Sequence, residues 1–347
     1  MLTVTQPAFA DVCYFLLLPW PAERPLPAGT PPTRPGRGAR KDTPYFLDLD
    51  IELRTLEQRQ LTIAGTTVQA TFQLVDEQVW VAECLFRLEQ PLHESAVERR
   101  RQIQTALNTT LQAEVGYHGP LAEEYTVLLL REALPNPDDF VADHAVTLAR
   151  LLRSVDTPPP AASAADFLVS RCRYASSDLV IVDWEGAVLI DEMADFEFDL
   201  ALLKLGNYQL LRYRMLDVNI EQQLKVLRRQ LQTRRLRWYP GRANLRRIVE
   251  QRLTLLFDFE KTDQSLLLIG DWYSAQVYRL IVAEFYLDDW KAAVSTKLDN
   301  LASIDEIIRQ DLAFSWDRLL DIVQIIGWLL LLIGYFVLYF ADIGWLR

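Results

Sequence analysis

The most constraining feature of this sequence is an uncharged apolar run near its C-terminus, Ile322 to Ala341, with the sequence IVQIIGWLLLLIGYFVLYFA. An α-helix rises about 1.5 Å per residue, so this run can form a helix about 30 Å long, the thickness of the hydrocarbon core of a bilayer. Gln324 is its only strongly polar residue. We therefore predict a single transmembrane anchor within residues 316–347.

A regular apolar pattern precedes this run. Between Tyr273 and Leu312, mostly apolar residues recur at alternating steps of four and three. This spacing is typical of a helix that packs against partner helices along one face. The same spacing begins soon after Asp191, and a Tyr-Pro-Gly stop follows at residues 239–241. We predict that residues 191–315 form a bundle of long helices or a coiled-coil stalk.

Six positions in these helices are candidates for assembly between copies of the chain. Four of them are apolar residues on the repeating face: Leu287, Val294, Leu298 and Leu301. Gly327 and Gly334 lie seven residues apart on one face of the apolar run, where small residues allow two helices to approach closely. The alternative is that these glycines are simply tolerated in lipid. The pattern favours a homo-oligomer.

Residues 1–190 have the pattern of an α+β domain. Val12 to Leu18 is an apolar run typical of a buried strand, and Tyr45 to Leu53 alternates apolar and polar residues with the period of a half-buried strand. Ser95 and Glu98 have the form of a capping box at the start of a helix that extends to about Val115, and a second, amphipathic helix is expected from Asp138 to Val155. Seven prolines within residues 19–41 predict a disordered loop. The expected fold class is thus an α+β N-terminal domain, a long helical hairpin or stalk, and one C-terminal transmembrane helix.

Cysteine usage and charge indicate a location. The three cysteines are odd in number and lie far apart in apolar runs, as expected of reduced thiols: Cys13, Cys84 and Cys172. No convincing signal peptide precedes the first apolar run. The basic residues Arg309 and Arg318 lie on the N-terminal side of the apolar run. We expect a single-pass protein of the bacterial inner (cytoplasmic) membrane with its N-terminal body in the cytoplasm.

Five acidic side chains precede the first long helix: Asp191, Glu192, Asp195, Glu197 and Asp199. Hard cations such as Mg²⁺ and Ca²⁺ bind several carboxylate oxygens, so this cluster is a candidate metal site. Acidic residues are also favoured at helix N-termini by the helix dipole alone, and the cluster lacks the spacing of a known ion-binding loop. Both interpretations stay open, and no cofactor other than Mg²⁺ or Ca²⁺ is expected.

A basic window follows. Residues 212–252 contain twelve Arg or Lys and three acidic residues, although the whole chain has a net charge of −11. Its paired arginines are candidates for binding an anionic lipid or an acidic protein partner: Arg228, Arg229, Arg234, Arg235, Arg237, Arg246 and Arg247. Nucleic acid is a less favoured partner. The window can equally pair with the acidic surface of its own chain.

No catalytic pattern is present in the sequence. The three histidines, His93, His118 and His144, are scattered and have no second ligand at metal-binding spacing. The sequence also lacks a phosphate-binding glycine-rich loop, a Gly-x-Ser-x-Gly elbow and a Cys-x-x-Cys pair. We therefore name no catalytic residue and expect a protein that is not an enzyme.

Several segments resemble the required-for-meiotic-nuclear-division family, whose members carry a C-terminal membrane anchor. The similar segments are Phe285 to Leu312, ahead of the apolar run, Asp178 to Ile190, and Leu202 to Asp217. The resemblance covers roughly residues 167–340. It implies a homo-oligomeric, membrane-anchored scaffold and supplies no catalytic residues.

The order of parts is also similar to that of CorA-type magnesium channels, in which an α+β domain precedes a long helix that enters the membrane. Those channels have two spans joined by a Gly-Met-Asn motif, whereas this chain has one apolar run and no such motif. We thus expect an oligomeric scaffold or interaction module in the lipid bilayer. The alternative is a CorA-like ion channel or a divalent-cation sensor that uses residues 191–199.

Overall fold

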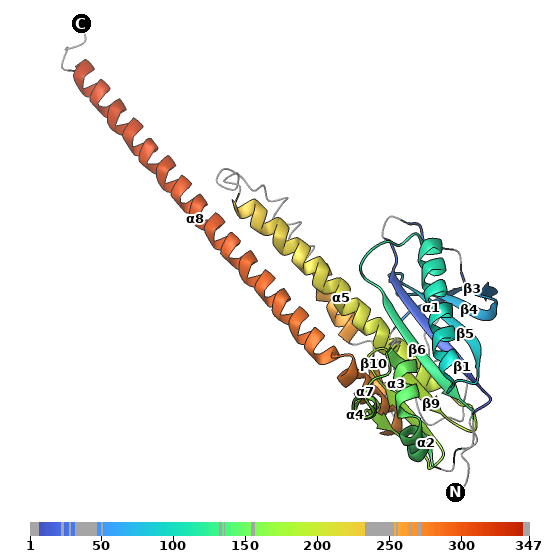
Figure 1. The fold of residues 1–347 in the computed structure, drawn as a ribbon. Helices are drawn as coiled ribbons and strands as arrows, with labels where there is room; N and C mark the ends of the chain where they lie inside the picture. The colour runs from blue at the N-terminus through green and yellow to red at the C-terminus, as the bar shows by residue number, and fades with distance from the viewer. Residues whose placement is uncertain are drawn as a thin grey trace. The chain divides into compact units, whose positions relative to one another are not determined.

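A computed structural model describes residues 7–21, 24–27, 29–31, 47–49, 51–131, 134, 136–153, 157–232, 253–254, 256–263, 266–269 and 272–342. The chain divides into two compact units, Met1–Val294 and Ser295–Arg347. We call the first unit the body. Each unit is described by itself, and Figure 1 labels the elements of both.

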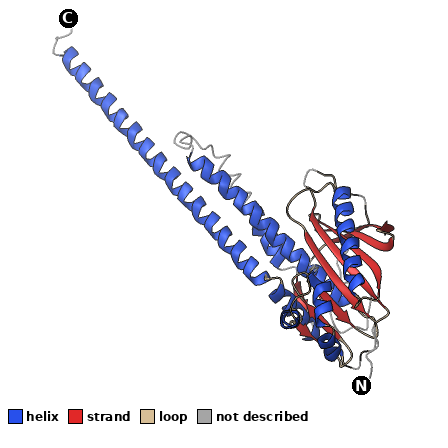
Figure 2. Ribbon diagram, in the orientation of Figure 1, coloured by secondary structure: helices blue, strands red, loops and turns tan. Residues whose placement is uncertain are grey.

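The body is built on a sheet of eight strands in the order β3-β4-β5-β1-β6-β9-β8-β7. The strands are β1 (Phe9–Pro19), β3 (Leu53–Ile63), β4 (Thr66–Val75), β5 (Val79–Glu89), β6 (Glu123–Leu130), β7 (Arg171–Cys172), β8 (Leu179–Val182) and β9 (Gly186–Ile190). All neighbouring strands are antiparallel except β6 and β9, which are parallel. The sheet is therefore mixed (Figure 2). A short separate ladder joins β2 (Leu47–Leu49) to β10 (Leu266–Ile269).

Strand β1 lies in the middle of the sheet, between β5 and β6. Successive side chains of a strand point to opposite faces, so a strand covered on both faces needs an unbroken apolar run. Val12, Tyr14, Leu16 and Leu18 belong to one core cluster together with residues of the first helix. The residues between them, such as Phe15 and Leu17, are equally buried on the other face. The predicted buried first strand is confirmed.

Helices cover both faces of this sheet. They are α1 (Glu94–Val115), α2 (Pro137–Asp143), α3 (Ala145–Arg153), α4 (Ala161–Asp166), α5 (Glu197–Gln232), α7 (Trp272–Glu284) and the start of α8 (Leu287–Asp342). Residues 256–263 are also helical. Helix α1 contacts β5 and β3, and α3 contacts β9 and β6. Helix α5 contacts β1 and β6. Lys204 of α5 lies over the ring of Phe15, which places α5 on the face opposite α1.

The start of α1 differs from the predicted capping box. The N-cap residue is His93, whose Nδ1 accepts a hydrogen bond from the Ser95 backbone N–H at 3.3 Å. Ser95 is therefore inside the first turn of the helix. At the other end Gly116 has φ of 66°, a left-handed conformation that glycine adopts without steric cost. The expected boundary of this helix near Val115 is correct.

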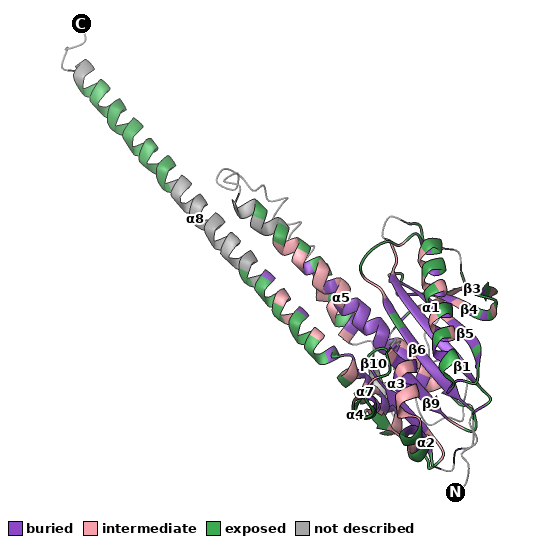
Figure 3. Ribbon diagram, in the orientation of Figure 1, coloured by how far each residue is buried: buried purple, intermediate pink, exposed green. Residues whose placement is uncertain are grey.

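A close contact joins α5 to α7. A Cβ atom on Gly206 of α5 would lie 2.3 Å from Cγ2 of Ile281 and 3.1 Å from the ring of Phe285. The missing side chain therefore allows the two helices to approach closely. After α7, Tyr286 has φ of 51°, and α8 begins at Leu287. The first half of α5 is buried against the sheet (Figure 3), so this helix is part of the body and the structure does not show a long hairpin stalk.

The second unit consists of the remainder of α8. Within it, Asp321–Tyr339 has a mean hydropathy of 2.2 and is 0% buried inside the structure. Every side chain from 321 to 339 is exposed, as the green part of α8 in Figure 3 shows. Among the described residues, this is the one helix long and apolar enough to cross a membrane.

Candidate functional site

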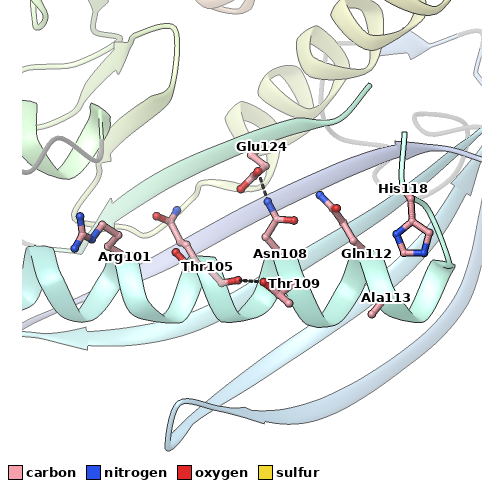
Figure 4. Close-up of a pocket in the computed structure, with 9 residues that line it drawn as sticks. Arg101, Thr105, Asn108, Thr109, Gln112, Ala113, His118 and Glu124 are labelled. Carbon is pink, nitrogen blue, oxygen red and sulfur yellow. Dashed lines mark hydrogen bonds between the residues drawn. The ribbon is translucent and has the colours of Figure 1, made fainter. Parts of the chain in front are cut away.

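A polar groove lies beside α1 in the described part of the body. It has a volume of about 650 Å³ and is lined by nine residues: Arg101, Gln104, Thr105, Asn108, Thr109, Gln112, Ala113, His118 and Glu124. Seven of them lie on α1, His118 follows the helix, and Glu124 comes from β6 (Figure 4). Eight of the nine residues have a polar side chain. We call this feature the α1 groove.

The α1 groove follows from the distribution of apolar and polar residues around α1. Ile103, Leu107 and Leu111 recur at steps of four and are buried in the core cluster of the sheet. Gln104, Asn108 and Gln112 recur with the same step, one position further along the helix. Residues four apart share a helix face, so the three amides form a row beside the buried row. We call these three residues the amide row.

The floor of the α1 groove is polar as well, because Glu124 and Thr126 of β6 bond to side chains of α1. Tyr14 of β1 donates a hydrogen bond from its hydroxyl to Glu124 Oε2 at 2.8 Å. The Asn108 amide donates to the other oxygen, Oε1. Burial raises the pKa of Glu124, and the hydrogen bond from Tyr14 opposes that rise. The carboxylate of Glu124 is therefore fixed from two sides.

Gln104 is held at the deep end of the α1 groove by a buried cation. Arg100 donates from Nη1 to Gln104 Oε1 at 2.6 Å and from Nη2 to the Arg150 carbonyl at 3.5 Å. Because its oxygen accepts from Arg100, Gln104 turns its Nε2 to the hydroxyl of Thr126, to which it donates. Burial lowers the pKa of Arg100 to about 10, so it stays charged at neutral pH.

The chemistry available in the α1 groove is hydrogen bonding. Its side chains offer amide donors and acceptors, hydroxyls, one carboxylate and one imidazole. Throughout the residues that the structure describes, no three His, Cys, Asp or Glu side chains meet in a group able to hold a metal ion. The groove is therefore a candidate for binding.

The predicted acidic cluster is distributed around the start of α5. Glu197 and Asp199 lie in the first turn of that helix, where negative charge is favoured. Asp191 Oδ1 accepts a hydrogen bond from the Met193 N–H at 2.7 Å and so shapes a turn. Glu192 and Asp195 are exposed. The five acids do not form a metal-binding group with any described side chain.

Asp199 is the one buried member of that cluster. Its Oδ2 accepts a hydrogen bond from the Tyr273 hydroxyl at 3.2 Å, which joins α5 to α7. Burial, together with the nearby carboxylates of Asp178, Asp191 and Asp195, raises the pKa of Asp199 to about 7 against the lowering effect of the hydrogen bond from Tyr273. This carboxyl group therefore changes its charge near neutral pH.

The predicted basic residues lie mostly outside the described part of the chain. This holds for Arg234, Arg235, Arg237, Arg246 and Arg247. Arg228 and Arg229 belong to α5, and of these two only the side chain of Arg229 is described; it is exposed. The proposed contact with an anionic partner stays a prediction.

The six predicted assembly positions fall into two groups. Leu287, Val294, Leu298 and Leu301 are each at most 6% exposed. Gly327 and Gly334 lie on the exposed apolar helix, and a Cβ added at either would meet nothing within 4 Å. The second group is thus accessible to a neighbouring helix.

Sequence reasoning missed the α1 groove. The signal was present, since Gln104, Asn108 and Gln112 recur every four residues in a predicted helix. A polar row on a helix is usually a solvated face, however, and the sequence alone does not show that Glu124 and Thr126 of β6 lie beside it. Their position depends on the strand order of the sheet.

The fold and the groove together define a protein with a mixed-sheet body, a polar groove on one face and an apolar helix near the C-terminus. Residues 50–197 match the family described as "Uncharacterized protein MJ0711, N-terminal domain". The matched segment includes α1 and β6, and hence the whole lining of the α1 groove. It ends where α5 begins.

One curated relative extends this similarity. The chain is 26% identical over 199 residues to "Uncharacterized protein MJ0711" of Methanocaldococcus jannaschii. The alignment covers 57% of this chain and 61% of the relative, so the chain spans about three fifths of the relative's length. No solved structure matches the chain. These comparisons give no support to the resemblance to the required-for-meiotic-nuclear-division family, which stays a prediction.

Proposed function

We propose that this protein is a membrane-anchored interaction protein that assembles with copies of itself and presents its body in the cytoplasm at the inner (cytoplasmic) membrane. The observation that carries the proposal is the segment Asp321–Tyr339, which has a mean hydropathy of 2.2, contains no charged residue after Asp321 and is exposed at every position. In water such a helix would leave a large apolar surface uncovered, whereas a bilayer covers it completely.

Fractionation of cells that express the full chain tests the anchor. We expect the protein in the membrane fraction, resistant to extraction with alkaline carbonate and released by detergent. A peripheral protein would instead be released by carbonate. Recovery of the chain in the soluble fraction at its monomer mass of 40.0 kDa would contradict the anchor.

Assembly through the apolar helix is a separate part of the proposal. Gly327 and Gly334 lie seven residues apart, which is two helical turns, so they share one face of α8. Two copies packed at this face would gain close van der Waals contact, and Gln324 near the same face offers an amide for a hydrogen bond between helices. Both gains require a second apolar helix.

Light scattering of the detergent-solubilised full chain tests this assembly. We expect a protein mass that is a multiple of 40.0 kDa. The double variant Gly327→Leu and Gly334→Leu is expected to lower that mass, because it blocks the close approach. The matched control, Leu329→Met and Phe336→Leu, changes the opposite face and is expected to leave the mass unchanged. A monomer in every case would overturn the homo-oligomer and leave the anchor intact.

The alternative of an ion channel or divalent-cation sensor has one observation in its favour. Asp199 is buried, and its Oδ1 has no hydrogen-bond partner among the described residues. Against it, no three potential ligands meet in the described part of the chain. A titration of the full chain with Mg²⁺ or Ca²⁺ distinguishes a cation channel or sensor from an interaction protein that binds no cation. Binding of the cation to the folded chain raises the melting temperature, whereas without binding the melting temperature stays unchanged.

A further inference from the structure

The two edge strands of the eight-stranded sheet differ in length. The edge strand β7 has two residues, Arg171–Cys172, whereas the other edge strand, β3, has eleven, Leu53–Ile63 (Figure 1). Short edge strands, prolines and lysines are common features that keep an edge from pairing with another chain. Strand β3 contains neither a proline nor a lysine. It is therefore the edge of the sheet that lacks this protection.

Part of β3 is open to a further strand. Near its start the Thr30 N–H donates a hydrogen bond to the Thr55 carbonyl at 3.0 Å, and the Thr55 N–H donates to Thr30 Oγ1 at 3.2 Å. A shift of register with β4 follows directly after Thr55. At its end, Ala64 and Gly65 have φ of 48° and 75° and form a two-residue turn into β4. The open part is residues 57–63, which we call the free segment of β3.

The backbone of the free segment directs hydrogen-bonding groups outward at three residues. Ile63 and Thr66 flank the two-residue turn and face each other in register, so they form a hydrogen-bonded pair. Every second residue before Ile63 bonds to β4 in the same way, and the residues between them direct their N–H and C=O away from β4. These residues are Gln58, Gln60 and Thr62, and all three are exposed. Within the part of the chain that the structure describes, their outward groups have no hydrogen-bond partner.

The outward groups favour one register of pairing between two copies. Gln60 is midway between Gln58 and Thr62, so antiparallel pairing about Gln60 places each outward residue opposite an outward residue of the second copy. The three pairs exchange two hydrogen bonds each, about six in all. A shift of register towards Thr55 would meet Thr30, which already occupies that part of the edge. A shift towards the turn would leave Gln58 without an opposite residue in the strand.

On the sheet face away from α1, the free segment is complementary to itself. Gln58, Gln60 and Thr62 alternate with residues whose β4 partners belong to the core cluster beneath α1, so the three side chains project from the opposite face. In the register about Gln60, Gln60 faces Gln60 of the second copy and Gln58 faces Thr62. These pairs are polar and uncharged, and their amides and hydroxyls supply both donors and acceptors.

On the α1 face, the charges of the free segment are compensated within each copy. Arg59 forms ion pairs with Glu57 at 3.6 Å and with Glu114 of α1. In the register about Gln60, Arg59 lies opposite Leu61 of the second copy, so like charges are not directly opposed there. The chain has a net charge of −11, which opposes contact between two copies through an acidic surface. The free segment has one acidic and one basic residue, so it allows that contact.

We propose that two copies of the chain join through antiparallel pairing of β3 about Gln60, so that their sheets become one continuous sheet. This inference rests on the proposed self-assembly and adds to it a contact in the body, separate from Gly327 and Gly334. Main-chain hydrogen bonds supply the affinity of such pairing, and the opposed side chains fix its register. The contact has two-fold symmetry and uses the same segment of both copies, so it closes on itself as a dimer.

Disulfide trapping in membranes that contain the full chain tests this pairing. Gln60→Cys places two thiols opposite each other, with Cα atoms about 5.5 Å apart, a separation that a disulfide spans. We expect oxidation with copper phenanthroline to give a reducible dimer of twice 40.0 kDa. Gln58→Cys is the matched control, because its two copies lie about 13 Å apart in this register. We expect it to give no more dimer than the natural chain, whose three cysteines set the background.

A charge at the two-fold axis tests the same register independently. Gln58→Cys combined with Thr62→Cys is expected to form the dimer, because these two residues face each other. Adding Gln60→Lys should slow dimer formation about fivefold, because it opposes two like charges. Adding Gln69→Lys is the control, since Gln69 is the exposed β4 residue that pairs with Gln60 in the same chain. It should leave the rate unchanged, and melting temperatures establish that every variant folds.

Two outcomes would overturn the pairing of β3. One is equal dimer formation by Gln60→Cys and Gln58→Cys, and the other is equal slowing by Gln60→Lys and Gln69→Lys. Light scattering of the natural full chain distinguishes this inference from the proposed self-assembly. An oligomeric mass without a Gln60→Cys dimer would overturn the β3 contact alone, whereas a monomer that gives no disulfide would overturn both.

Discussion

Two apolar runs of this protein have nearly the same chemistry and opposite surroundings. Val12 to Leu18 in β1 is uncharged and almost wholly buried by the chain's own helices. Ile322 to Tyr339 in α8 is equally apolar and exposed at every position. The first run finds an apolar environment inside the protein, whereas the second has none within its own unit. The two runs also differ in length: the shorter one fits as a strand inside the body, whereas the longer one forms a helix long enough to cross a bilayer.

The largest expected effect comes from charging the centre of the exposed run. The double change Leu330→Arg and Leu331→Arg should cost about 5–7 kcal/mol of membrane insertion, because each central Arg costs about 2.5–3.5 kcal/mol. Carbonate extraction of membranes measures the outcome, and we expect the variant in the soluble or degraded fraction. The single change Ile322→Arg at the end of the run is the control, since an Arg there reaches the interface. Equal retention of both variants would show that the helix is not a span.

The next effect tests the buried run. Leu16 is fully buried in the core of the sheet, so Leu16→Ala leaves a cavity and should lower the free energy of unfolding by about 2–5 kcal/mol. Urea denaturation followed by circular dichroism measures this change. Leu26→Ala serves as the control, because Leu26 is 45% exposed. This variant should lose little free energy of unfolding. A similar loss at both positions would mean that β1 is not the centre of the body.

A matched pair of glycines compares the two regions directly. Gly206→Ala places a Cβ 2.3 Å from Ile281, so we expect a loss of about 1–3 kcal/mol from overpacking between α5 and α7. Gly327→Ala meets nothing within 4 Å and should leave the stability of the body unchanged. Thermal melting of the two variants side by side gives the comparison. An unchanged melting temperature for Gly206→Ala would contradict the close α5–α7 contact.

The smallest effect concerns a charge at the end of the buried run. Glu123 of β6 pairs in register with Leu17 and forms an ion pair with Arg214 of α5. Burial raises the pKa of Glu123 to about 7 against the lowering effect of the ion pair with Arg214. The folded chain then binds this proton more tightly than the unfolded chain does. Its contribution to stability is fully present below about pH 4.5 and is lost as the pH rises to about 7.

The variant Glu123→Gln isolates this contribution. We expect it to remove about 1–2 kcal/mol of pH dependence between pH 4.5 and 7, measured by urea denaturation at a series of pH values. Glu77→Gln, which changes an exposed carboxylate, is the control and should leave the pH dependence unchanged. If the natural chain instead gains stability as the pH rises over this range and Glu123→Gln abolishes that gain, the pKa of Glu123 is lowered in the folded state.

Local patterns in the sequence predicted the elements that depend on near neighbours. The apolar run of β1, the C-terminal boundary of α1 near Val115, and the apolar helix after Ile322 all follow from periodicity and length. The helix expected from Asp138 to Val155 forms in two pieces, α2 and α3, because the chain turns at His144. That break carries no proline or glycine, so no local signal marks it.

The α1 groove and the role of α5 could not be predicted in the same way. Gln104 is adjacent to Thr126 only because β6 pairs with β1 and not with β5. The seam of α5 has the spacing of a stalk helix, yet its first half packs on the sheet, where it buries residues such as Leu203 and Leu211. Periodicity shows which face of a helix is buried, and it does not show what buries it.

The sequence by itself determined that one apolar run is long enough to cross a bilayer and that another is the right length for a buried strand. It also determined the mixed content of helices and strands in the body. The tertiary structure alone decided which side chains meet in the α1 groove, why Gly206 has no side chain, and which acids around Asp199 share one environment. The physical reason is that secondary structure depends on residues a few positions apart, whereas a site depends on contacts between segments that are distant in the sequence.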